Sequence, residues 1–143
     1  MPFQSLVNAQ QLEVVVAGPG DITRLYVCKG LAQGYFSVQA QQGQWQSASD
    51  TWQFGVGPQL SSMQFRRAIA TVGFAGIQEN EPGGGSVSWI LQNVIADYDD
   101  DAGNVRVSVT STLQVSNQGT AGQWSFAGVS SLAYDVSILA AVT

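Results

Sequence analysis

The sequence contains no histidine and only one cysteine, Cys28. The missing histidine removes Ser-His-Asp and Cys-His catalysis and the usual zinc sites. A single cysteine excludes an intrachain disulfide, and its position in the strand-like stretch 22–28 predicts a small buried side chain. No nucleophile motif takes the place of the missing groups. We therefore expect a protein that is not an enzyme and that carries no cofactor apart from a possible Ca²⁺ ion.

Charge is also scarce: charged residues are 10% of the 143, and the net charge is −5. Binding to nucleic acid needs lysine and arginine to neutralise phosphates. Arg66 and Arg67 are the only adjacent pair among five such residues, so we expect no nucleic-acid partner. These two arginines favour pairing with acidic groups at the surface or at a subunit interface, with ligand binding as the alternative.

Long apolar runs are absent too. No stretch approaches the ~18 apolar residues that span a bilayer. Residues 1–11 (MPFQSLVNAQQ) lack both the basic and the apolar segments of a Sec signal peptide. The sequence therefore predicts a protein without a transmembrane segment that stays in the cytoplasm or is released without a Sec signal.

What the chain does contain is alternation with a period of two, separated by glycine-rich turns, and no helical stripe. About eight or nine such segments predict an all-β fold, an antiparallel β-sandwich or jelly roll. Among the expected boundaries are a break at residues 30–34 and a division of the last part of the chain into strands at residues 124–129 and 131–142. The length fits one domain, residues 1–143. Within it, residues 1–11 are expected as an N-terminal arm or edge segment. Residues 78–86 (QENEPGGGS) are expected as a flexible loop.

The clearest pattern is a hairpin over residues 86–115. Its second half alternates valines with polar residues, which indicates one buried and one wet face. A loop with an even number of residues keeps Asp97 and Asp99 out of the dry face, where unpaired carboxylates would be costly. This register assigns the dry face to Val94, Ala96, Tyr98, Val105, Val107 and Val109.

The tip of this hairpin is acidic. Asp97, Asp99 and Asp101 stand at alternate positions and offer the oxygen ligands that Ca²⁺ takes. The EF-hand spacing is not met, because Ala102 and Ser108 occupy the places of the loop glycine and the bidentate glutamate. The calcium site is therefore one of three alternatives.

The second alternative is a solvated turn, in which aspartates satisfy the local backbone and Gly103 takes a positive φ. The third is direct contact with a ligand through Asp97, Asp99, Asn104 and Arg106. A glycosidase is not favoured, because its two carboxyl groups must face each other across a cleft.

Two tryptophans, Trp45 and Trp124, each follow Gly-Gln in a polar stretch. An indole ring stacks on the apolar face of a sugar, and neighbouring amides bind its hydroxyls. The alternative is that both rings cap the ends of the hydrophobic core. The candidate ligand-binding residues are thus Trp45, Trp124, Asp97, Asp99, Asn104 and Arg106.

From Phe65 onward the chain shows a characteristic succession of segments: FRRAIA, a Gly-Phe step, the acidic turn ending in Gly-Asn, alternating valines and the closing YDVSILA. This layout resembles that of the bacterial β-sandwich domains related to H-type lectins, over about residues 65–143. The resemblance implies a six-stranded core, a homotrimer and recognition of sugars such as N-acetylgalactosamine. It assigns no sugar-contacting residue to a position in this chain.

Two functions follow as expectations. The first is a carbohydrate-binding, lectin-like module that acts as a homo-oligomer, with a trimer favoured. The second is a structural subunit of a particle, fibre, tail or capsid, because low charge and a Gln-rich surface are typical of assembling β-proteins. The expected partners are accordingly a glycan or copies of the chain itself.

Overall fold

The computed structural model describes residues 2–16, 23–80, 85–119 and 122–141, and these residues form strands and no helix. None of the described residues therefore belongs to a helix long and apolar enough to cross a membrane. The strands are β1 (Phe3–Val16), β2 (Thr23–Gln41), β3 (Trp45–Val56), β4 (Phe65–Asn80), β5 (Gly85–Asp99), β6 (Asn104–Asn117) and β7 (Trp124–Ala141).

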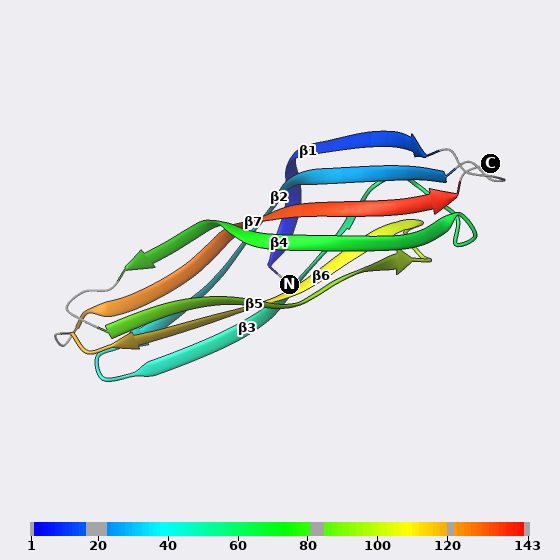
Figure 1. Cartoon of the computed structure of the whole chain (residues 1–143). Coiled ribbons are helices and arrows are strands. Elements are labelled where there is room, and N and C mark those ends of the chain that lie inside the picture. The colour runs from blue at the N-terminus through cyan, green and yellow to red at the C-terminus, as the bar shows by residue number, and fades with distance from the viewer. Residues whose placement is uncertain (1, 17–22, 81–84, 120–121, 142–143) are drawn as a thin grey trace.

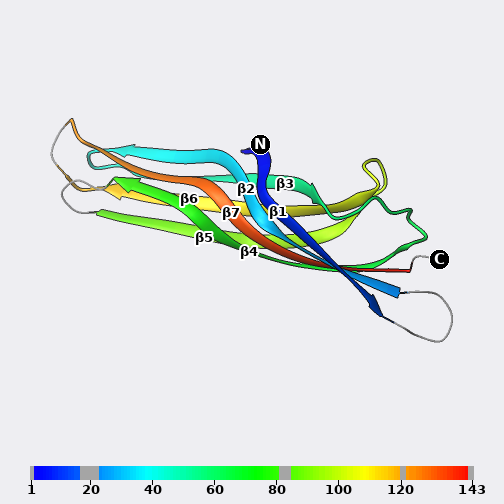
Figure 2. The same ribbon diagram turned by 90° about the horizontal axis from the view of Figure 1, so that it is seen from above.

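The strands form two antiparallel sheets that lie one above the other in an elongated body (Figures 1 and 2). One sheet has the order β1-β2-β7-β4 and the other has the order β3-β6-β5. Inward-facing residues of both sheets form one hydrophobic core. The central strands β6 and β7 contribute most of its fully buried side chains, among them Val105, Val107, Leu113, Val136 and Ile138.

The two sheets confirm the expected all-β antiparallel class, but the described chain has seven strands instead of eight or nine. The first difference is at residues 30–34, where glycines predicted a break and β2 runs through. A Cβ on Gly30 would lie 2.6 Å from the hydroxyl oxygen of Tyr134, and one on Gly34 would lie 2.0 Å from the carbonyl oxygen of Pro2. These glycines allow close approach of other groups within a strand and do not form a turn.

Two further predicted boundaries are absent. The stretches 124–129 and 131–142 form the single strand β7, of which residues 142–143 lie outside the described residues. Residues 1–11 were expected as an N-terminal arm or an edge segment, and the second alternative is confirmed: from Phe3 onward they are the first part of the edge strand β1, while Met1 lies outside the described residues. Of the expected loop 78–86, residues 78–80 belong to β4 and residues 85–86 to β5, and residues 81–84 are outside the described residues.

The hairpin register is confirmed in its outer part. Tyr98 pairs with Val105 and Ala96 with Val107, around a four-residue turn in which Gly103 has a φ of 73°. The assignment of Val94 to the dry face is wrong, because its side chain is 38% exposed. A bulge between Gln92 and Ile95 shifts the register at that point.

Candidate functional site

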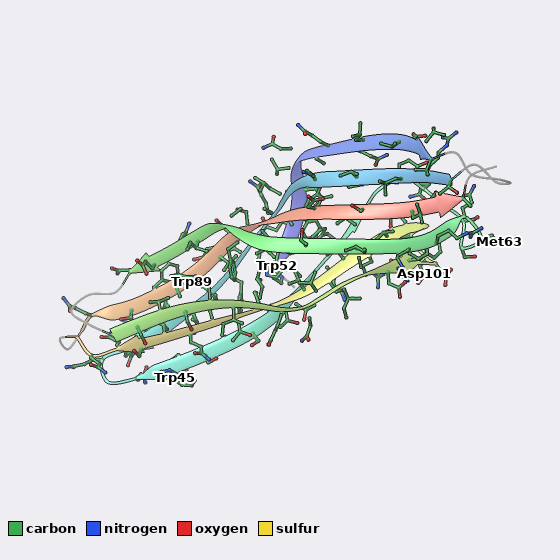
Figure 3. All side chains as sticks on the ribbon, in the orientation of Figure 1. Trp45, Trp52, Met63, Trp89 and Asp101 are labelled. Atoms are coloured by element: carbon green, nitrogen blue, oxygen red, sulfur yellow. The ribbon has the colours of Figure 1, made fainter. Side chains whose placement is uncertain are left out.

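The candidate ligand-binding residues lie at opposite ends of the molecule. Trp45 and Trp124 begin β3 and β7 at the end that contains the turn at residues 42–44. The other four candidates, Asp97, Asp99, Asn104 and Arg106, lie on the β5–β6 hairpin. Figure 3 shows Trp45 and Asp101 toward opposite ends of the body. The structure therefore separates the aromatic candidates from the acidic ones.

At the aromatic end, Trp124 lines a shallow hollow of about 320 Å³ together with Gln41, Gln42, Gly122 and Gln123. We call these five residues the Trp124 hollow. Trp124 pairs with Gln41 across the β2–β7 ladder, and the next pair, Ala40 and Ser125, is fully buried. Because side chains alternate along a strand, Trp124 projects to the outer face. Its indole is 45% exposed, so a ligand can reach the ring.

The loops around the Trp124 hollow are held by one buried amide, Asn117. Its Nδ2 donates to the carbonyl oxygens of Ala40 and Gln123, at 3.1 and 2.8 Å, and its Oδ1 accepts from the backbone N–H of Gly119 at 2.8 Å. Its backbone also pairs with the 43–44 turn. A fully satisfied buried amide fixes the segments that it joins. The hollow is therefore held in place by hydrogen bonds from both of its sides.

Trp45 lies at the same end but on the outer face of the other sheet. It pairs with Ser116, and the neighbouring pair Gln46–Val115 places Val115 in the core, so Trp45 and Ser116 point outward. The indole is 61% exposed. Beside it, the hydroxyls of Ser116 and Ser86 lie 3.1 Å apart. Trp45 thus forms a second exposed aromatic platform, separate from the Trp124 hollow.

The lining of the Trp124 hollow has a simple chemistry: one indole, three side-chain amides and no charged group. Each glutamine offers both a donor and an acceptor, which suits hydroxyl groups of either role. The exposed ring offers an apolar surface for stacking. An uncharged, hydroxyl-rich ligand with one apolar face fits this combination.

At the opposite end, the acidic tip is tied to its own hairpin. Asp99 Oδ1 accepts from the backbone N–H groups of Asp101 and Ala102, at 3.1 and 3.4 Å, and Asp99 Oδ2 pairs with Arg106. Asp97 Oδ1 accepts from the backbone N–H of Tyr98 at 2.7 Å. These bonds are those of a turn that satisfies local donors.

The tip is also fastened to the loop before β4. Leu60 donates its backbone N–H to the carbonyl of Gly103 at 2.8 Å, and Tyr98 donates its hydroxyl to the carbonyl of Leu60 at 2.6 Å. The Tyr98 and Phe65 rings stack with centroids 5.5 Å apart. These contacts give the tip a structural role in closing this end of the core.

A hollow of about 470 Å³ lies along the tip and is lined by Asp97, Asp99, Asp100, Asp101, Arg106 and neighbouring residues. Asn104 packs against Gly55 and does not line it. The described residues contain no group of three metal-ligating side chains arranged to hold an ion. Of the three expected carboxylates, Asp99 already has both oxygens in hydrogen bonds.

The sequence did not identify the residues that complete the Trp124 hollow. Gln41 and Gln42 come from the end of β2, and Asn117 comes from the end of β6. The antiparallel pairing of β2 with β7 brings the two glutamines to Trp124, and no local sequence pattern predicts that pairing. The shared Gly-Gln-Trp context was the only sequence feature that pointed to this site, and it pointed only to the two tryptophans.

Comparison of the chain with protein-family models, with curated proteins and with solved structures gives no match.

Proposed function

We propose that this protein is a non-enzymatic, lectin-like β-sandwich module that binds carbohydrate in the Trp124 hollow and acts as a homo-oligomer. The observation that carries the proposal is the exposed Trp124 indole in a hollow lined by three glutamines. The resemblance of residues 65–143 to domains related to H-type lectins supports it, because these residues form the four strands β4 to β7, which contribute to both sheets.

The ligand class follows from the lining. A neutral sugar stacks one face of its ring on the indole and exchanges hydrogen bonds with the side-chain amides of Gln41 and Gln42. A phosphorylated or sulfated sugar would find no cation in the lining. Trp45 provides a second stacking platform on the other sheet, flanked by serine hydroxyls.

The first test is a titration of the intrinsic tryptophan fluorescence with neutral monosaccharides and oligosaccharides. Trp45 and Trp124 are both exposed, whereas Trp52 is fully buried, so a bound sugar changes the emission of the exposed pair. Replacing Trp124 by alanine should cost about 1–2 kcal/mol of binding, which is about a five- to thirty-fold weaker affinity. Trp124→Phe, which keeps a ring, should retain part of the affinity.

The second candidate function is a structural, self-assembling subunit. The observation that favours it is the exposure of aliphatic side chains on the edge strand β1, where Leu12 and Val15 are 62% and 61% exposed. A subunit of this kind forms large assemblies and binds no sugar. Light scattering on the purified protein, together with the titration above, separates the two functions.

A further inference from the structure

The outer face of the β1-β2-β7-β4 sheet carries an unusual amount of aliphatic surface. Strand pairing aligns Leu12 with Val27, Ser137 and Ile69 in one row, and Val14 with Leu25, Leu139 and Arg67 in the next. On β2 and β7 the alternate residues Tyr26, Cys28, Val136 and Ile138 are buried in the core, so both rows face outward. We call this surface the apolar outer face, comprising Leu12, Val14, Val16, Leu25, Val27, Ile69, Leu139 and Ala141.

Several of these side chains are well exposed. Leu12 and Ile69 are each 62% exposed, and Val14 and Val16 are 42% and 43% exposed. Beside Leu12 and Val27 there is a hollow of about 530 Å³ on the same surface, between β1 and β2. Clustered aliphatic exposure of this kind marks an interaction surface more often than it marks a free one.

The size of the apolar outer face indicates the strength of the contact. Four strands about 4.8 Å apart and three rows about 6.8 Å apart give a footprint of roughly 400 Å², including polar positions such as Ser137 and Arg67. A standard interface buries about 800 Å² on each partner. The apolar outer face covers about half of this area, which fits a weak, reversible association.

The charges around the apolar outer face favour a second copy of the same chain. Its border carries Lys29 and Asp135, paired at 3.4 Å, and Arg67 stands at the β4 edge. These three charges sum to +1, so the remainder of the chain, with a total of −5, carries −6. Two copies that meet through this face therefore avoid bringing their acidic remainders together, and Lys29 and Asp135 give the rim one charge of each sign. An apolar centre with a polar rim of both signs is also the usual anatomy of an interface.

We propose that the apolar outer face packs against the apolar outer face of a second copy, in a two-fold contact. This inference rests on the homo-oligomer part of the proposed function and is independent of the ligand. A two-fold contact pairs the same surface on both copies, so it closes as a dimer. It differs from the trimer that the lectin resemblance implies.

Sedimentation equilibrium over a range of protein concentrations tests this contact. The wild-type mass should rise with concentration from 15.1 kDa toward twice that value. Leu12→Lys and Ile69→Lys should each raise the dissociation constant at least tenfold, because a lysine would be buried in the contact. The matched control is Ile90→Lys, which changes a 42% exposed residue of the other sheet and should leave the dissociation constant unchanged.

A wild-type protein that remains monomeric at every concentration, or that assembles as a trimer, would overturn the inference. Equal association of Leu12→Lys, Ile69→Lys and wild type would also overturn it. Circular dichroism confirms that each variant is folded. The sugar titration of Leu12→Lys measures sugar binding in the Trp124 hollow independently of self-association. If this variant no longer self-associates but still binds sugar, the dimer contact and the sugar site are separate, and each proposal can fail without the other.

Discussion

Trp52 Nε1 donates a hydrogen bond to Ser111 Oγ at 3.0 Å, and both side chains are fully buried. They belong to adjacent strands, β3 and β6, in the middle of the core. The large indole fills the space between the sheets, and its one polar atom needs a partner there. A serine between Val109 and Leu113 on the buried face of β6 therefore has a structural explanation.

Replacing Ser111 by alanine should lower the free energy of unfolding by about 1–3 kcal/mol, because the indole N–H is left buried without a partner. Ser108→Ala is the matched control, since Ser108 is half-buried on the outer face of the same strand. Urea unfolding of both variants measures the difference. Equal losses in the two variants would contradict the role assigned to Ser111.

The close contact at Gly34 predicts a strong effect of a single methyl group. Gly34→Ala would place a Cβ against the Pro2 carbonyl and 2.9 Å from the Trp52 ring, so we expect a loss of about 1–3 kcal/mol. Gly73→Ala is the control, because its Cβ would meet nothing within 4 Å. It should be neutral or stabilising by up to about 1 kcal/mol. Thermal unfolding of the two variants measures both changes. A Gly34→Ala variant as stable as wild type would refute the explanation for the continuous β2.

Burial raises the pKa of the Cys28 thiol above its ordinary value of 9.0, and the charge of Asp135 raises it further. The unfolded chain therefore loses this proton at a lower pH than the folded protein does. As the pH rises above 9.0, the free energy of unfolding should fall. Tyr134, whose pKa is raised by burial and by Cys28, acts in the same direction.

Cys28→Ala removes one of these two groups and should therefore flatten this loss without abolishing it. Urea unfolding at neutral pH and above 9.0, for wild type and variant, measures the change. Parallel curves for the two proteins would show that the thiol contributes nothing to the pH dependence.

The two nearby carboxylates of the hairpin tip should differ in their contribution to stability. Asp99→Ala removes acceptors for two turn N–H groups and for Arg106, so we expect a loss of about 1–3 kcal/mol. Asp97→Ala, which changes an exposed side chain, should stay within about 0.5 kcal/mol of wild type. Thermal unfolding gives both values.

Calcium provides an independent check on the tip. Because the Asp99 oxygens already have partners, added Ca²⁺ should leave the melting temperature of the wild-type protein unchanged. A ligand that binds the folded state raises the melting temperature. A clear rise with Ca²⁺ that disappears in Asp101→Ala would favour the calcium alternative over the turn.

The sequence predicted the hairpin well because its evidence is local. Alternation along residues 105–115 and the cost of burying Asp97 and Asp99 determine which side is dry. It failed at Val94, since Asn93 adopts a φ of 57° inside a bulge that no residue pattern signals. The predicted number of strands was too high for a related reason. Glycine marks a turn or a close approach equally well, and only the tertiary contacts of Gly30 and Gly34 distinguish the two.

The candidate site was predictable in part. The Gly-Gln-Trp context in polar stretches made Trp45 and Trp124 candidates, but the glutamines of the Trp124 hollow and the Asn117 hydrogen bonds depend on strand pairing across distant segments. The acidic tip became a candidate site because of its composition alone. A hairpin turn that bonds to its own backbone has the same composition as a ligand site.

In the proposed function, the tryptophan end of the molecule binds neutral sugar and the acidic end does not. The most direct test of this function is a glycan array probed with the wild type, with Trp124→Ala and with the opposite-end control Asp101→Ala. We expect wild type and Asp101→Ala to bind the same neutral glycans equally, and Trp124→Ala to bind them about five- to thirty-fold more weakly. No glycan bound by the wild-type protein, or a loss in Asp101→Ala with retention in Trp124→Ala, would contradict it.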